Sequence, residues 1–255
     1  MIQSGIVNAF IPISGKETPV QQLETHDPPA PVVSFRQLLL ILAAVLVGTV
    51  TAAVVLPIWL PGISHSLVAS EPKAYWYLSR ASGFVAYGLL WLSMVLGLLI
   101  TNRFARVWPG GPLAVDMHQY GSILALAFVL FHGLILLGDQ YIGYTWLQLV
   151  VPFASLEYQP LAVGAGQLAT WLLVPLILSF YVKQKIGRPL WRAIHMTSFA
   201  VFLLALVHGL ASGTDSDRIW AIMLYWVSGG SVLLLTVYRV LMARLPHTAE
   251  RPRAT

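Results

Sequence analysis

Hydrophobic residues in this chain gather into long runs that turn residues or short charged stretches separate. A helix of about 20 apolar residues is long enough to cross a bilayer. The pattern therefore predicts an all-α integral membrane protein, a six-helix bundle. The six predicted spans are about 37–60, 80–101, 113–138, 165–182, 190–212 and 219–241.

The flanking segments have a different character. Residues 1–35 are polar and proline-containing, which favours a flexible tail. We assign 36–245 to the transmembrane domain and 246–255 to a short basic tail. Between the third and fourth spans, residues 146–153 begin with Trp146, and aromatic side chains favour the membrane boundary. We expect a short interfacial helix there.

Composition supports a membrane protein and excludes several metal centres. The chain is 57% hydrophobic and 10% charged, whereas soluble domains carry about 25% charged residues. It has no cysteine, which excludes disulfides, cysteine-ligated iron–sulfur clusters and covalently attached haem. The net charge is +5, but the basic residues lie in loops and tails between apolar runs. We therefore expect lipid, and no nucleic acid, as a partner.

The basic residues also predict an orientation. Of the 15 Lys and Arg residues, only Lys73, Arg80 and Arg218 fall on one side of the six-span scheme. The other side includes both tails. Because cytoplasmic loops are rich in Lys and Arg, we predict a multi-pass protein of the inner (plasma) membrane with both termini in the cytoplasm.

Four histidines are almost the only ionisable side chains inside the predicted spans. His118 and His132 lie in the third span, and His195 and His208 lie in the fifth. An ionisable residue within a membrane span usually marks a functional site. The third and fifth spans run in the same direction, so the first histidine of each lies near the cytoplasmic end. Two pairs at two depths follow, separated by roughly 20 Å along the helices.

Such pairs suit haem iron. Two neutral imidazoles on facing helices fill both axial positions, an arrangement that favours electron transfer. Gly133 and Gly209 follow the outer pair, where a missing side chain leaves room for a macrocycle. Arg188 and Arg192 lie near the inner pair and are candidates to neutralise haem propionates.

One feature of the spacing opposes this scheme. His118 and His132 are 14 residues apart and share a helix face, whereas His195 and His208 are 13 apart. On an ideal helix, 13 residues leave two side chains about 140° apart. Tilt, a local bulge or laterally displaced haems must compensate.

The paired histidines resemble the pattern of the ferric reductase-like transmembrane superfamily. That group includes eukaryotic ferric reductases, NADPH oxidases and the haem-binding membrane subunit of a bacterial methionine sulfoxide reductase system. The segments 191–195 (WRAIH), 208–215 (HGLASGTD) and 80–83 (RASG) are similar to bacterial members. The resemblance covers about residues 75–245.

The resemblance implies haem sites between the third and fifth helices. His118 and His195 would ligate an inner haem b, and His132 and His208 an outer one. The implied function is transmembrane electron transfer to an external acceptor. The sequence contains no flavin or nicotinamide module of the kind fused to the oxidases. We therefore expect an oxidoreductase component that takes electrons from a separate flavoprotein reductase or from quinol, with flavin or quinone on that partner.

Two other functions fit the same histidines. A membrane cytochrome b that oxidises quinol is one, although no sequence feature marks a quinone pocket. A transporter in which histidines relay protons or a transition metal is the other. Relay histidines need acidic or hydrated neighbours, and the predicted spans offer almost none.

Overall fold

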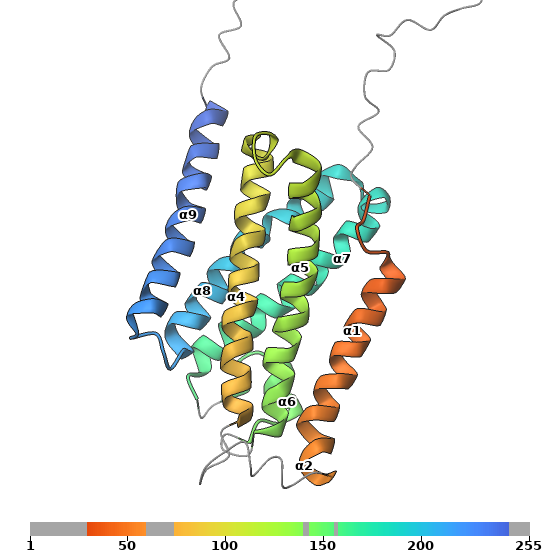
Figure 1. Ribbon diagram of the computed structural model, residues 1–255, viewed down its shortest axis with the longest axis vertical. Helices are drawn as coiled ribbons and strands as arrows, with labels where there is room; N and C mark the ends of the chain where they lie inside the picture. Colours follow the sequence, from red (N-terminus) through yellow and green to blue (C-terminus); the bar gives the residue numbers. More distant parts are fainter. Residues whose placement is uncertain (1–29, 60–73, 140–142, 156–157, 245–255) are drawn as a thin grey trace, which may run out of the picture. The chain divides into compact units, whose positions relative to one another are not determined.

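The computed structural model describes residues 30–59, 74–139, 143–155 and 158–244. Within these ranges every regular element is helical and no strand occurs. Residues 1–29 of the predicted tail 1–35, the loop residues 60–73, residue 245 and the predicted basic tail 246–255 lie outside the described residues. The all-α fold class is therefore confirmed for the described part of the chain (Figure 1).

The helices are long and follow the hydrophobic runs. The short 3₁₀ helices η2 and η3 follow α4 and α5, and η1 is a π-helical stretch that continues α1. The elements in order are α1 (Phe35–Val50), η1 (Thr51–Val55), α2 (Leu56–Trp59), α4 (Ala74–Thr101), η2 (Phe104–Arg106), α5 (Gly111–Leu134), η3 (Ile135–Gly138), α6 (Trp146–Val150), α7 (Pro160–Met196), α8 (Ser198–Ser212) and α9 (Ile219–Arg244).

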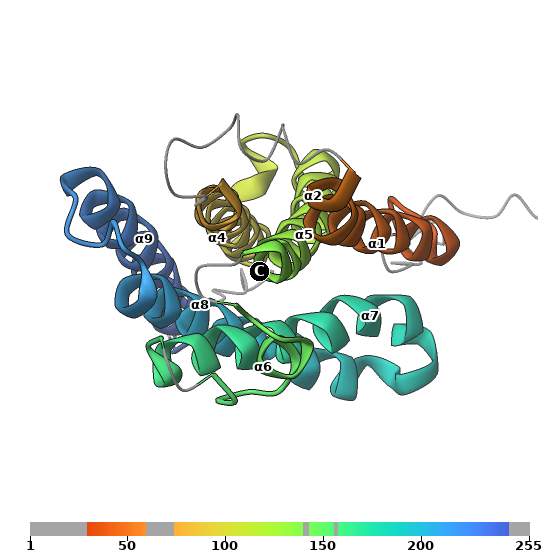
Figure 2. The same ribbon diagram turned by 90° about the horizontal axis from the view of Figure 1, so that it is seen from below.

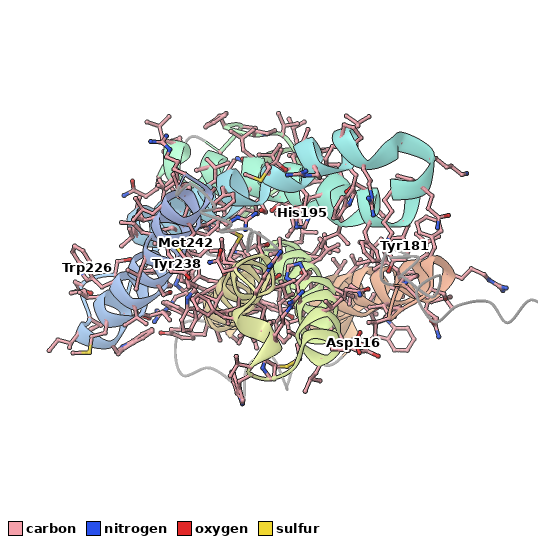
Figure 3. All side chains as sticks on the ribbon, turned by 90° about the horizontal axis from the view of Figure 1, so that it is seen from above. Asp116, Tyr181, His195, Trp226, Tyr238 and Met242 are labelled. Atoms are coloured by element: carbon pink, nitrogen blue, oxygen red, sulfur yellow. The ribbon has the colours of Figure 1, made fainter. Side chains whose placement is uncertain are left out.

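In the described ranges, five helical stretches are long and apolar enough to cross a membrane: Phe35–Val55, Ala74–Thr101, Gly111–Gly138, Pro160–Ser212 and Ile219–Arg244. Several helices of this length and hydrophobicity are typical of a multi-pass membrane protein. Large apolar side chains cover the outward surfaces. Trp226 on α9 is 77% exposed and points away from the other helices in Figure 3. Such a surface is suited to contact with lipid.

The longest stretch turns back on itself and so supplies two segments of membrane length. Gly187 has φ 79° and ψ 160°, which are not helical angles. Glycine reaches this region without the steric cost that a Cβ brings. The second arm then packs against the first, so that His208 contacts Ala162. The sequence pattern thus places the reversal correctly.

The boundaries of these segments differ from the sequence prediction. The region 183–189, predicted as a basic loop, is helical up to the reversal. Lys183 lies in this helix with its ammonium 3.8 Å from the ring centre of Phe180. A lysine can belong to a helix just beyond its apolar residues, because its aliphatic stem lies along apolar surface while its ammonium stays in a polar environment. The second span also begins earlier than predicted, at Ala74.

Helices α4 and α5 pack along their length, as do α7 and α8, whereas the two pairs approach each other less closely. Figure 2 shows α1, α4 and α5 on one side and α7 and α8 on the other. The segment before α1 is held in place: Val32 N–H donates to Gln119 on α5, and the Tyr181 hydroxyl of α7 donates to the Val33 carbonyl. The tail predicted for 1–35 is therefore fixed at its last residues.

Candidate functional site

The four membrane histidines form two pairs between α5 and the α7–α8 segment. The ring centres of His118 and His195 are 6.1 Å apart, and those of His132 and His208 are 6.0 Å apart. The ring planes cross at 69° and 77°. Figure 3 shows His195 lying towards α5. The structure thus brings together the partners that helix direction paired in the sequence.

A break between α7 and α8 offsets part of the angle that the 13-residue spacing leaves between His195 and His208. The Thr197 N–H donates to the Ile194 carbonyl, three residues earlier, at 3.0 Å, and its hydroxyl donates to the same carbonyl at 2.7 Å. A three-residue turn winds the chain by about 120° per residue instead of about 100°. Overwinding turns His208 in the direction that closes the gap of about 140° expected from an ideal helix.

Three of the four rings are anchored through Nδ1 to main-chain carbonyls on a neighbouring helix. Nδ1 lies 2.9 Å from the Ser93 carbonyl oxygen for His118 and 2.7 Å from that of Ser79 for His132. His208 Nδ1 lies 2.9 Å from the Ala162 carbonyl oxygen. A neutral ring whose Nδ1 carries the proton presents a lone pair at Nε2.

Serine hydroxyls reinforce these anchors. Ser93 Oγ lies 3.1 Å from Nδ1 of His118. Ser79 Oγ likewise lies 3.1 Å from Nδ1 of His132. Ser212 Oγ lies 3.2 Å from Nδ1 of His208. Carbonyl and hydroxyl together define the position of each ring. Second contacts of this kind fix the orientation of ligand histidines and raise their basicity.

His195 is held differently. Among the described residues, none forms a hydrogen bond with its ring. The ring instead stacks on Trp191, one turn earlier in the same segment, with centres 5.1 Å apart and planes inclined at 25°. This contact is internal to the segment, and so it does not fix the ring relative to α4 or α5.

Glycines on facing helices allow the anchored rings to approach. A Cβ added at Gly83 would lie 2.9 Å from His132 Nδ1, and one at Gly166 would lie 2.7 Å from His208 Nδ1. At Gly97 the nearest atom is His118 Cε1, at 3.4 Å. Gly133 and Gly209, which the sequence suggested as room for a macrocycle, are not among the glycines that face a histidine ring: a Cβ at Gly133 would meet Leu149, and one at Gly209 would meet Tyr225.

These anchoring residues are not among those predicted from the sequence, although α4 carries a signal for them. Ser79 and Gly83 are four residues apart, and Ser93 and Gly97 repeat that pair fourteen residues later. Fourteen is also the spacing of the two histidines on α5. Because α4 and α5 pack together with the same spacing of fourteen residues, one Ser–Gly pair of α4 lies beside each of the two histidines of α5.

The two arginines that are candidates to neutralise haem propionates lie in the short segment between Gly187 and Thr197. Arg188 and Arg192 are exposed there, seven and three residues before His195. Spacings of three and seven place residues near one face of a helix. Near the start of α4, Arg80 forms an ion pair with Asp215. Arg80 directly follows the anchor residue Ser79 in the sequence.

Each pair offers two ligands to a metal. Among the residues that the structure describes, no three His, Asp or Glu side chains gather as a metal site. Zinc and similar free ions usually take three or four protein ligands. Two imidazoles suit an iron whose remaining positions belong to a macrocycle.

A family model for a domain of unknown function, DUF8596, matches residues 74–215, more than half of the chain. The chain belongs to the DUF8596 family. No curated protein and no solved structure matches it. The DUF8596 match runs from the first residue of α4 to Asp215, so it includes all four histidines and their anchors and leaves out α1 and α9.

Proposed function

We propose that this DUF8596 protein is a membrane cytochrome that carries electrons across the bilayer through two b-type haems. His118 and His195 hold the inner haem, and His132 and His208 hold the outer one. The observation that carries the proposal is the separation of the paired rings, 6.1 and 6.0 Å between centres.

That separation fits one metal ion between two imidazoles. A metal–imidazole bond is about 2.0–2.1 Å long, and the centre of the ring lies about 1 Å beyond its nitrogen. Two ligands on opposite sides of one ion therefore have centres roughly 6 Å apart. The Nδ1 anchors support this fit, because in the three anchored rings they direct the lone pair to Nε2.

The protein residues favour electron transfer over substrate chemistry. Haem would supply a one-electron carrier, and the two histidines of each pair would hold its iron and leave no position for a substrate. Anchored rings keep their geometry when the charge of the site changes. The two pairs lie roughly 20 Å apart along α5, which is most of a hydrocarbon core of about 30 Å. Electrons would thus cross the membrane in a short relay.

The basic residues favour a direction and a partner. With both termini in the cytoplasm, the exposed Arg188 and Arg192 lie at the inner end, where they can neutralise propionates. We propose a ferric reductase-like oxidoreductase component in the inner membrane. A separate flavoprotein reductase or quinol donates the electrons, and an external redox acceptor receives them.

An absorption spectrum of the purified protein tests the proposal. Protein produced with added haem should contain two haems per chain that acid-acetone extracts, and reduction should give the sharp bands of six-coordinate b-type haem. His132→Ala and His118→Ala should each weaken one component. Protein that folds and carries no haem would refute the proposal and favour a histidine relay in a transporter.

A further inference from the structure

The two histidine pairs are not equivalent, and the difference lies in His195. Both members of the outer pair, His132 and His208, are bound to a carbonyl of a neighbouring helix. In the inner pair, as far as the described residues go, only His118 has such an anchor. Its partner stacks on Trp191, which belongs to the same short segment.

The backbone around His195 is also interrupted on both sides. Gly187 reverses the chain eight residues before it, and Thr197 breaks the helix two residues after it. The segment between these points is about two turns long and carries the exposed Arg188 and Arg192. His208, by contrast, lies inside α8, and its ring is pressed against the α7 backbone at Gly166.

On this basis we propose that the inner site is also a binding site for a small diatomic ligand, with His195 as the exchangeable axial ligand. This inference rests on the proposed haem sites. With haem bound there, His195 would leave the iron and the incoming ligand would take its place, an exchange that needs no electron or proton transfer. Trp191 is a positioning residue that holds the displaced ring close enough to rebind.

The anchors define the expected difference between the two sites. Removing the hydrogen-bonding partners of a metal-bound histidine typically weakens metal binding by about 10- to 100-fold. Within the described part of the chain His195 has no such partner, whereas both outer histidines have one. The inner site should therefore exchange a ligand about 10- to 100-fold faster than the outer one.

Carbon monoxide added to the reduced full-length protein is a direct probe, because it binds only where an axial histidine has left. On a timescale of minutes, the unmodified protein should bind one carbon monoxide for two haems. His195→Ala should still bind one, because it opens the site that is already exchangeable. His132→Ala or His208→Ala should bind two. Haem content measured on each sample reports whether the variant has kept both sites.

A second variant keeps the test valid if the histidine substitutions lose haem. Trp191→Ala should speed carbon monoxide binding, whereas Trp226→Ala, on the outward face of α9, should leave it unchanged. No binding, equal binding at both haems, or a count of two for His195→Ala with one for His132→Ala would overturn the inference. Absence of haem would instead refute the proposed function.

Discussion

Substitution of Gly83 by alanine tests whether the close approach of α4 positions the outer histidine pair. The added Cβ would lie 2.9 Å from Nδ1 and 3.0 Å from Cε1 of His132. Carbon contacts are comfortable at about 3.5–4.0 Å. The ring must therefore move away from α4 by about 0.5–1 Å, or the two helices must separate.

That movement breaks the anchor. Nδ1 of His132 donates to the Ser79 carbonyl, also on α4, over 2.7 Å. A shift of about 0.5–1 Å takes this distance to roughly 3.2–3.7 Å, at or beyond the limit of a hydrogen bond. Loss of such a support typically weakens a metal site by about 10- to 100-fold. Overpacking costs a further ~1–3 kcal/mol of folding stability.

The rate of haem transfer to excess apomyoglobin measures the effect. In Gly83→Ala the phase that belongs to the outer haem should accelerate by about 10- to 100-fold. Gly88→Ala is the matched control, because it lies on the same helix and a Cβ there meets no atom within 4 Å. Gly97→Ala, whose nearest contact is 3.4 Å, should have a smaller effect on the inner haem. Equal rates for Gly83→Ala and Gly88→Ala would refute the reasoning.

Three further predictions concern the pairing, the ring orientation and the topology. His132→Ala and His208→Ala should convert the same six-coordinate spectral component to a five-coordinate one, and His118→Ala and His195→Ala the other; matching changes for His118→Ala and His208→Ala would contradict the pairing. The ring planes cross at 69° and 77°, so the oxidised protein should give a strongly anisotropic low-spin electron paramagnetic resonance signal; the more rhombic signal of parallel imidazoles would contradict that geometry. A reporter fused after Thr255 should function only in the cytoplasm, and activity only outside would reverse the inner and outer assignments.

The positions of the membrane helices could largely be predicted from the sequence, because apolar runs and Gly–Pro breaks are local signals. The ends of the helices could not. Helix α4 begins at Ala74, with Tyr75, Trp76 and Tyr77 in its first turn, and a hydrophobic pattern does not distinguish such aromatic residues from a preceding loop. Lys183 is helical although the sequence predicts a loop there. A charged residue directly after an apolar run resembles the end of a membrane helix.

The histidines of the candidate site were also evident, because ionisable residues are rare in apolar runs. Their surroundings were not. The carbonyls of Ser79, Ser93 and Ala162 belong to the main chain, and every residue has one. The break at Thr197 depends on backbone geometry that no single residue type determines. Only the repeated Ser–Gly spacing on α4 was accessible in the sequence.

The use of main-chain carbonyls as anchors has a consequence for how the site tolerates mutation. A side-chain substitution does not remove a carbonyl, so small residues at Ser79 and Ser93 should lose the hydroxyl contact but keep the bond to the carbonyl, and Ala162 should accept other small residues in a saturation screen. Gly83 and Gly166 should accept almost none, because any Cβ there meets a ring within 2.9 Å. The parts of the site under strongest selection would then be the histidines and the empty space beside them, while the hydrogen bonds that orient the rings persist as the surrounding sequence drifts.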